Sequence, residues 1–483
     1  MANFNKVQKN TPNAISYEGG AVYKKEPINE WLNMVFSSFL ENGFYESADT
    51  QRQRFLDLTN TVAQTYGYEF VAKVAVFTRN ELGMRSIAQL VAAWLNNKKF
   101  EYKRSFYRNF MHRPDDVAEI FAAIDILNQK RSHALVRGAA DYLSDLNAYS
   151  LGKYKLNSRQ YNMFDLINIT HANSPVIDAY KNGILEAPDT WEVKISAQSN
   201  KEDRDVEWKR LVEEGKLGYM ALIRNLNNIL DIEGLTMDWI GRYLVPQLED
   251  INNIKKSLIF PYRIYTAYKN LRVKPLSVVC ALNNAFSIAT SNMPQLEGNT
   301  AVILDISGSM TSPISSHSNI SILEAGACFA TAIFLQNPKT TTLAKFGDYG
   351  KVMELNPLVP AFDIVNQMCK NDGLGHGTYI ESAFRALQRT HVDYNRMFLI
   401  SDMQVMDTHT YGYFGDSVVK LYHQLFHQIP VYSFDLGNYS TQIVSEYDHI
   451  HYLTTLSDQV FKFIDLLESG VNLVSYISQF DYC

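Results

Sequence analysis

The chain contains 483 residues, of which 46 % are hydrophobic and 20 % are charged. This composition excludes a wholly disordered chain, and the length predicts two to four domains. No run of about 18 consecutive apolar residues occurs, so we expect no membrane span, and the polar stretch Met1–Thr11 does not resemble a secretory signal. The four cysteines lie far apart without a CxxC pair, which excludes a zinc ribbon and a disulfide framework and favours a cytoplasmic protein.

Charge is distributed unevenly along the chain. Residues 301–483 contain 9 basic and 18 acidic residues, a net charge of −9, whereas the preceding part contains 36 basic and 33 acidic residues, a net charge of +3. A mean charge this small does not make a general polyanion binder, so a nucleic-acid site would have to be a local patch. The acidic excess is equally consistent with an ordinary solvated surface.

The first 290 residues are predicted to be helical. Apolar residues recur at helical spacing in one segment after another, as in Trp31, Val35 and Phe36, and strand-like alternation is scarce. Many such helices in series predict an α-solenoid of HEAT-like repeats, with an irregular helical bundle as the alternative. The polar stretch Ala197–Asp205 is predicted to be an exposed loop.

The remaining residues alternate between strand and helix patterns. Such alternation predicts an α/β fold with a doubly wound parallel sheet, whose ligands bind at the carboxyl ends of the strands. We therefore expect a helical domain at 1–297 and an α/β domain at 298–483. The expected strands are Thr300–Asp305, Thr340–Phe346, Lys351–Leu355, Arg396–Ser401 and Pro430–Asp435, and the expected helices are Asn319–Gln336, Phe362–Lys370, Tyr379–Arg389, Ser417–Phe426 and Asp458–Ser469.

Polar side chains follow the expected strands at their carboxyl ends. A DxSxS pattern follows the first strand, a threonine follows a glycine-rich loop, and an aspartate ends the strand at 396–401. Oxygen donors without His or Cys favour Mg²⁺, or Ca²⁺ or Mn²⁺, over zinc. The structural alternative is a serine-rich turn with a capping aspartate. The candidate metal ligands are Asp305, Ser307, Ser309, Thr378 and Asp402.

Enzymatic sites are not favoured by the motifs of the chain. GxSxG is absent around Ser307 and Ser309, and no GxxxxGK[ST] pattern occurs, so neither a nucleophile elbow nor a nucleotide motor is expected. The five candidate ligands instead resemble the metal-ion-dependent adhesion site of von Willebrand factor A domains. This resemblance implies a non-catalytic site with an open metal position for a partner carboxylate or phosphate.

The helical part, followed by an A domain, resembles the TROVE-domain family, to which the Ro autoantigen belongs. The similar segments occur in the order found in the family. They are Gly19–Tyr23, Phe39–Tyr45, Lys153–Lys155, Phe164–His171, Tyr219–Leu226 and Arg272–Leu276.

The resemblance implies a monomeric ring of helical repeats whose ends are joined by the A domain. Single-stranded 3′ ends of misfolded RNA would enter a basic central hole, small structured Y RNAs would bind the outer surface, and exonucleases would act as partners. Lys153 and His171 match the family's RNA contacts by motif, and Arg159 matches with one extra residue between the motifs. A satisfied helix-end histidine is the structural alternative for His171.

A second basic cluster precedes these motifs and has aromatic residues interleaved with it. This mixture suits an RNA surface, because bases stack on aromatic rings while phosphates contact cations. The alternative is a solvated helix whose aromatic residues face the core. The candidates in this cluster are Lys103, Arg104 and Arg108. Two functions therefore remain open, namely a non-catalytic RNA-binding ribonucleoprotein and a metal-dependent protein-interaction scaffold that acts without RNA.

Overall fold

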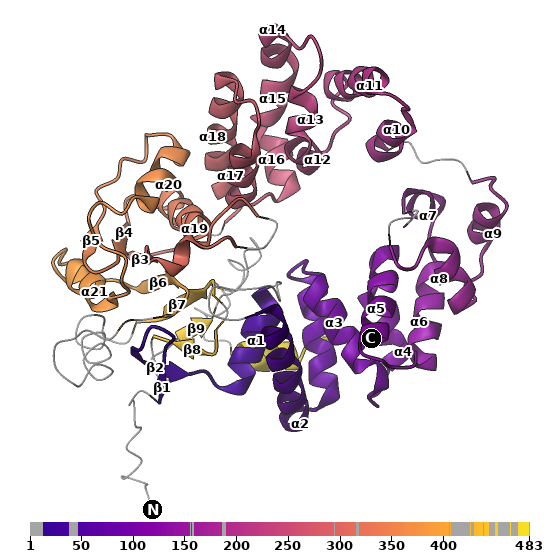
Figure 1. Ribbon diagram of the computed structural model, residues 1–483, viewed down its shortest axis with the longest axis horizontal. Helices are drawn as coiled ribbons and strands as arrows, with labels where there is room; N and C mark the ends of the chain where they lie inside the picture. Colours follow the sequence, from indigo (N-terminus) through magenta and orange to yellow (C-terminus); the bar gives the residue numbers. More distant parts are fainter. Residues whose placement is uncertain are drawn as a thin grey trace, which may run out of the picture. The chain divides into compact units, whose positions relative to one another are not determined.

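The chain forms two compact units, each made from two separate stretches (Figure 1). The first unit comprises residues 1–54 and 245–462, and the second comprises residues 55–244 and 463–483. This division differs from the expected boundary at 297/298, because residues 245–297 pack with the α/β part. The computed structural model describes residues 13–37, 47–154, 156, 159–185, 190–293, 295–314, 318–404, 406, 426, 429–437, 439–443, 450–452, 464 and 472–482.

A six-stranded sheet in the order β5-β4-β3-β6-β7-β9 forms the centre of the first unit. All neighbouring pairs are parallel except β4 and β5, which are antiparallel at one edge. The predicted α/β fold with a doubly wound sheet is therefore confirmed. The strands are β3 (Thr300–Asp305), β4 (Thr341–Phe346), β5 (Gly350–Val352), β6 (Arg396–Ser401), β7 (Val431–Asp435) and β9 (Ile450–Tyr452).

Helices cover both faces of this sheet, and every residue of the central strand β3 is therefore buried. On one face, Ile303 packs in a cluster with Phe384 of α21. On the other, Gly326 of α19 lies so close to Leu304 that an added Cβ would be 2.8 Å from its side chain. The helices are α19 (Ile322–Gln336), α20 (Ala361–Cys369) and α21 (Ile380–Gln388). The expected helices at 417–426 and 458–469 lie outside the described residues, apart from residues 426 and 464.

A short hairpin near the N-terminus belongs to this unit and was not predicted. Strand β1 (Ala14–Ile15) pairs antiparallel with β2 (Ala21–Lys24), and β2 pairs with β8 (Thr441–Gln442). The turn between β1 and β2 uses Gly19 at φ 84°, a conformation that favours glycine. The segment Gly19–Tyr23 noted in the sequence therefore includes part of a hairpin turn and strand β2. These strands are too short to show the alternation that identifies a strand in a sequence.

Among the remaining helices of the first unit, α15, α16 and α17 pack on α18. Helix α17 packs against α18 and α19, and α18 also contacts α20. Apolar faces of these helices are buried, including Ile264 of α17 and Phe286 of α18. Their bounds are α1 (Pro27–Ser37), α15 (Val245–Leu248), α16 (Ile251–Ser257), α17 (Pro261–Asn270) and α18 (Leu276–Thr290), and α2 (Ala48–Asn80) begins here and continues into the second unit.

The second unit is a series of helices that pack on near neighbours in the chain. Helix α3 packs on α5, α4 on α6, and α6 on α8, as expected for an α-solenoid of HEAT-like repeats. No helix among the described residues is both long and apolar enough to cross a membrane. The helices are α3 (Ser86–Trp94), α4 (Lys103–Phe110), α5 (Pro114–Ile126), α6 (His133–Ser144), α7 (Ala148–Lys153), α8 (Met163–Thr170), α9 (Pro175–Lys181), α10 (Trp191–Ala197), α11 (Lys201–Glu213), α12 (Tyr219–Arg224), α13 (Leu226–Leu230) and α14 (Met237–Trp239).

The prediction of an exposed loop at Ala197–Asp205 is mostly wrong, because α11 begins at Lys201. Asn200 caps this helix by accepting a hydrogen bond of 2.8 Å from the backbone N–H of Asp203. Acidic residues in the first turn favour a helix start through the helix dipole. The polar character of the segment therefore reflects a capped, solvated helix rather than a loop.

The C-terminal segment, residues 472–482, packs on helices of the second unit. It contains α24 (Leu473–Ser478). The ring of Phe480 meets that of Phe77 edge-on at 5.6 Å, and the hydroxyl of Tyr482 donates a hydrogen bond of 3.2 Å to the backbone oxygen of Glu101. This segment therefore fastens the end of the chain to α2 and to the residues just before α4.

Candidate functional site

Two candidate metal ligands lie at the carboxyl ends of adjacent parallel strands. Asp305 is the last residue of β3, and Asp402 directly follows β6, the strand that pairs with β3. Both side chains are buried. The topology therefore brings the two carboxylates to one edge of the sheet, as the sequence pattern predicted.

The turn after β3 places two serine hydroxyls beside Asp305. The backbone N–H of Ser307 donates a hydrogen bond of 2.8 Å to Asp305 Oδ1, and the hydroxyl oxygens of Ser307 and Ser309 are 3.4 Å apart. The backbone N–H of Gly308 donates a hydrogen bond of 3.0 Å to the carbonyl oxygen of His376. This bond ties the turn to the glycine-rich loop that precedes Thr378.

The glycine-rich loop holds Thr378 in a buried position. The backbone N–H of Gly377 donates a hydrogen bond of 2.8 Å to Asp348 Oδ1. Gly375 has φ 80°, and a Cβ added to it would lie 1.9 Å from the Asp348 carboxylate. Asp348 and the loop glycines therefore fix the backbone that presents Thr378. His376, in the same loop, is exposed.

Ser401 is a residue of this site that sequence reasoning missed. Its hydroxyl donates a hydrogen bond of 2.6 Å to Asp305 Oδ2 and accepts one of 2.9 Å from the backbone N–H of Met403. A serine directly before a strand-end aspartate was the available signal. Ser401 joins β6 to β3 and orients the carboxylate of Asp305.

The two buried carboxylates share an unfavourable electrostatic environment. Burial raises the pKa of Asp305, an effect that hydrogen bonds from Ser401 and Ser307 partly offset. Burial also raises the pKa of Asp402, and the negative charge of Asp305 raises it further. Neither aspartate forms an ion pair within the described part of the chain. A cation between them would therefore relieve their desolvation and mutual repulsion.

The donor set fits a hard divalent cation. Two carboxylates and three hydroxyls, all buried, supply oxygen donors of the kind that Mg²⁺ prefers. Across the ranges the structure describes, no group of three or more His, Cys, Asp and Glu side chains could hold a metal. A metal site built on Asp305 and Asp402 would therefore need ligands of another kind, and the buried hydroxyls of Ser307, Ser309 and Thr378 are candidates.

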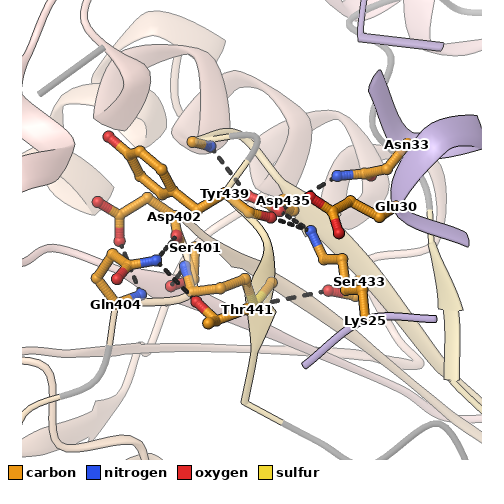
Figure 2. A network of polar contacts seen from close by, with 12 residues as sticks. Lys25, Glu30, Asn33, Ser401, Asp402, Gln404, Ser433, Asp435, Tyr439 and Thr441 are labelled. Atoms are coloured by element: carbon orange, nitrogen blue, oxygen red, sulfur yellow. Dashed lines mark hydrogen bonds and ion pairs between the residues drawn. The ribbon is translucent and has the colours of Figure 1, made fainter. Parts of the chain in front are cut away.

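A third strand-end aspartate has a different partner (Figure 2). Asp435 ends β7, and its carboxylate is bonded to the ammonium of Lys25, whose side chain is fully buried. Lys25 also donates a hydrogen bond of 2.7 Å to the carbonyl oxygen of Tyr439. Asn33 Nδ2 donates a further bond of 3.3 Å to Asp435. The protein itself therefore neutralises Asp435 with a lysine from the N-terminal segment.

The motif-matched RNA candidates lie around α5 in the second unit. Lys153 contacts Glu192 at 3.2 Å, and Arg159 contacts Glu119 of α5 at 2.6 Å. Tyr154, next to Lys153, receives the Arg113 guanidinium over its ring at 5.0 Å. Both candidates are thus held by ion pairs, and α5 is anchored to the segments that carry them.

His171 is exposed and ends α8 in the left-handed conformation, at φ 57°. No hydrogen bond or ion pair of its side chain occurs among the described residues. The structural alternative of a satisfied histidine at the helix end is therefore not seen. The imidazole faces solvent and is accessible to a ligand.

The second basic cluster is engaged in helix packing. Arg104 forms two hydrogen bonds of 2.7 Å with Asp141 of α6, and Arg108 forms one of 2.6 Å with Asp145. Lys103 donates to two backbone carbonyls, and burial lowers its pKa to about 8. The interleaved aromatic residues Phe106, Tyr107 and Phe110 are buried, as the structural alternative for this cluster predicted.

A different aromatic surface is exposed on α2. Gly67 interrupts this helix with φ 85° and ψ 162°, and Tyr66 and Tyr68 on either side of it are partly exposed. The ammonium of Lys98 lies 4.6 Å over the ring of Trp94 and 5.8 Å over that of Tyr68. Aromatic rings next to a lysine are typical of surfaces on which unpaired bases stack.

Comparison with known proteins supports the relationship expected from the motifs. Residues 172–301 match the family described as the TROVE domain. Telomerase protein component 1 of Rattus norvegicus is 32 % identical over 87 residues, which cover 18 % of this chain and 3 % of that protein. Telomerase protein component 1 of Mus musculus is 21 % identical over 333 residues, which cover 50 % of this chain and 12 % of that protein. The chain thus spans only a small part of these relatives.

A solved structure shares the fold over nearly the whole chain. The crystal structure of the Deinococcus radiodurans RO (RSR) protein superposes with a TM-score of 0.64 and 15 % sequence identity, covering 91 % of this chain and 99 % of that one. This likeness shows a common fold of helical repeats and an α/β domain. The resemblance to the TROVE-domain family that the sequence predicted is confirmed by the match over residues 172–301.

Proposed function

We propose that this protein is a non-catalytic RNA-binding protein of the ribonucleoprotein type. The observation that carries the proposal is the TROVE-domain match on a chain whose helical repeats place the motif-matched cations at the protein surface. RNA would be held mainly through its phosphates, so its affinity would fall as the salt concentration rises. Exposed tyrosines on α2 would add stacking for unpaired bases.

Lys153, Arg159 and His171 are the proposed RNA contacts. Lys153 and Arg159 each form an ion pair with a glutamate, and a phosphate would replace that glutamate on binding. Exposed ion pairs contribute little stability, typically about 0–1 kcal/mol, so replacing the glutamate with a phosphate would cost little free energy. His171 supplies an exposed imidazole at the end of α8.

In its finer form, the proposal assigns two kinds of RNA to two surfaces. Small structured RNAs resembling Y RNA would bind the outer surface, and single-stranded ends of misfolded RNA would enter a central hole. An exonuclease would act on the bound RNA as a partner, in RNA quality control. The family resemblance of the motifs supports this assignment, together with the need of single strands for aromatic surfaces.

We also propose a divalent cation, Mg²⁺ above all, at the strand-end site. Asp305, Ser307, Ser309, Thr378 and Asp402 would hold it, because they are buried oxygen donors and the two carboxylates have no ion-pair partner among the described residues. When bound, such a cation supplies a Lewis-acidic position open to an acidic group of a partner. The observation favours a second function as well, that of a metal-dependent protein-interaction scaffold acting without RNA.

An electrophoretic mobility shift tests RNA binding directly. Structured RNA with a single-stranded 3′ tail should bind at about 100 mM salt, where phosphate contacts still act. Joint replacement Lys153→Gln, Arg159→Gln and His171→Gln should weaken binding at least tenfold, while Arg210→Gln on α11 should not. Absence of binding by the wild-type chain would defeat the proposal.

A partner assay separates the two functions. Recovery of a protein partner that needs Mg²⁺, resists RNase and is lost in Asp305→Ala would favour the scaffold. RNA binding that survives Asp305→Ala would show that the RNA surface and the metal site act separately.

A further inference from the structure

The N-terminal hairpin, residues 13–25, reaches both loops that carry candidate metal ligands. The backbone N–H of Tyr17 donates a hydrogen bond of 2.9 Å to the side-chain oxygen of Gln404, two residues after Asp402. Gly19 forms a backbone bridge with Met406, and the N–H of Met406 donates a bond of 3.3 Å to the carbonyl oxygen of Thr378. The hairpin is thus linked by backbone contacts to the segments that present Asp402 and Thr378.

Gln404 connects the hairpin to Asp402 most directly. Its backbone N–H donates to Asp402 Oδ1 at 3.3 Å, and its side-chain Nε2 donates to the Asp402 carbonyl oxygen at 3.3 Å and to Thr441 Oγ1 at 3.2 Å (Figure 2). Gln404 is completely buried. With its side-chain oxygen accepting from Tyr17, this amide has little freedom to turn, so the hairpin fixes the backbone around Asp402.

Lys25 acts on Asp402 only indirectly, through residues that pack against it. It joins the carboxylate of Asp435 to the carbonyl oxygen of Tyr439. The turn at residues 435–437 packs on Asp402, since a Cβ added to Gly437 would lie 2.8 Å from the Asp402 Cβ. The ring of Tyr439 in turn meets that of Tyr17 edge-on at 5.6 Å. Lys25 therefore holds the turn that covers Asp402.

We propose that the N-terminal hairpin is a positioning element of the metal site, so that cation binding and hairpin docking stabilise one another. The inference rests on the proposed metal site and deepens it. Asp402 can bind a cation only with its carboxylate correctly aimed, and the hairpin sets that aim through Gln404 and through the turn held by Lys25. Coupling between two sites is reciprocal, so each event must favour the other by the same factor.

Hydrogen exchange of the full-length chain, with and without Mg²⁺, tests this coupling. Metal should slow exchange of the amides in residues 17–25, including Lys25, whose N–H donates to the carbonyl oxygen of Ser440 at 3.1 Å. Amides at the opposite sheet edge, such as Met353, which bonds to Leu343 at 2.8 Å, should change little. Asp305→Ala should abolish the protection of the hairpin.

Free Mn²⁺ measured by electron paramagnetic resonance gives an independent record of metal binding. If Mn²⁺ binds but the hairpin amides are unprotected, the coupling is refuted while the metal site stands. If Mn²⁺ does not bind to the wild-type chain, the proposed metal site itself fails.

A matched pair of variants tests the reverse direction. Tyr17→Pro removes both hairpin contacts, the N–H that bonds to Gln404 and the ring that meets Tyr439, whereas Tyr17→Phe keeps both. Mn²⁺ affinity should fall about fivefold or more in Tyr17→Pro, in the range usual for coupled sites, and should be unchanged in Tyr17→Phe. Equal affinity in both variants would overturn the proposal. Should Tyr17→Pro not fold, the exchange experiment on the wild-type chain remains decisive.

Discussion

The hydroxyl of Ser401 donates a hydrogen bond of 2.6 Å to Asp305 Oδ2 and so joins two adjacent strands at the proposed metal site. Metal ligands that lose such an outer partner typically bind about 10–100-fold more weakly. Ser401→Ala should therefore lower Mn²⁺ affinity by about tenfold, as measured by electron paramagnetic resonance of free Mn²⁺.

A suitable control for Ser401→Ala is Thr331→Val in α19. The Thr331 hydroxyl is buried and has no hydrogen-bond partner within the described ranges, so its removal leaves no unpaired group. Mn²⁺ affinity in this variant should match that of the wild type. An unchanged affinity in Ser401→Ala would show that this hydrogen bond does not orient a metal ligand.

The buried carboxylate of Asp116 should make the stability of the second unit depend on pH. Burial alone would raise the pKa of Asp116, but the hydrogen bond and charge of Arg79, with a further bond from the N–H of His112, lower it below the ordinary value. A group with a depressed folded pKa stabilises the fold fully above its unfolded pKa, and this contribution is lost as the pH falls through the folded pKa. Stability should therefore decrease below about pH 4.

Denaturant unfolding between pH 3 and pH 7 measures this effect. Asp116→Asn should lose about 3–5 kcal/mol at pH 7, because Arg79 is left buried without its charge partner. The variant should also show a shallower loss of stability in acid than the wild type. Parallel curves for the two proteins would contradict the assignment.

Gly138 marks the closest approach of two repeat helices. A Cβ added to it would lie 2.7 Å from the carbonyl oxygen of Arg104 and 2.7 Å from the Cβ of Tyr107. Gly138→Ala should therefore destabilise the second unit by about 1–3 kcal/mol through overpacking, even though alanine favours helices. Thermal unfolding measures the change. Gly241→Ala, where an added Cβ meets nothing within 4 Å, is the control.

Removing the glutamate that holds Arg159 should strengthen RNA binding. Glu119→Gln breaks the 2.6 Å ion pair and leaves Arg159 available to a phosphate without prior exchange. Affinity should rise by up to about fivefold at low salt, the range that exposed ion pairs allow. Glu207→Gln, which loosens Arg210 on α11, should have no effect on binding. Weaker binding in Glu119→Gln would mean that the ion pair orients Arg159 for RNA.

The centre of the sheet could be predicted from the sequence because its strands are continuous apolar runs. Strands β3 and β6 have the predicted bounds, and β7 differs by one residue. The meeting of strand-end residues at one edge of a parallel sheet follows from topology, so the neighbouring positions of Asp305 and Asp402 could be predicted without coordinates. The short edge strand β5 was predicted at Lys351–Leu355, so its start lies one residue late and its end three residues late, and the strand is antiparallel.

Other features depend on contacts that no local pattern reveals. Lys25 meets Asp435 across 410 positions of the chain, and nothing near Lys25 in the sequence distinguishes it from a surface lysine. Hairpin strands β1 and β2 are two and four residues long, too short for periodicity. The sequence left the role of the basic cluster around Arg104 open, because its acidic partners Asp141 and Asp145 are 37 positions away.

The fastening of residues 472–482 to α2 and to Glu101 has a practical consequence for dividing this protein. A fragment that stops before residue 298 would lose the aromatic cover over Phe77 and expose it to water. A fragment that starts at residue 298 would contain residues 472–482 but not the helices on which they pack. It would also lack Lys25, which neutralises Asp435. Neither half can be expected to fold as it does in the intact chain, so fragments meant to fold independently need boundaries other than residue 298.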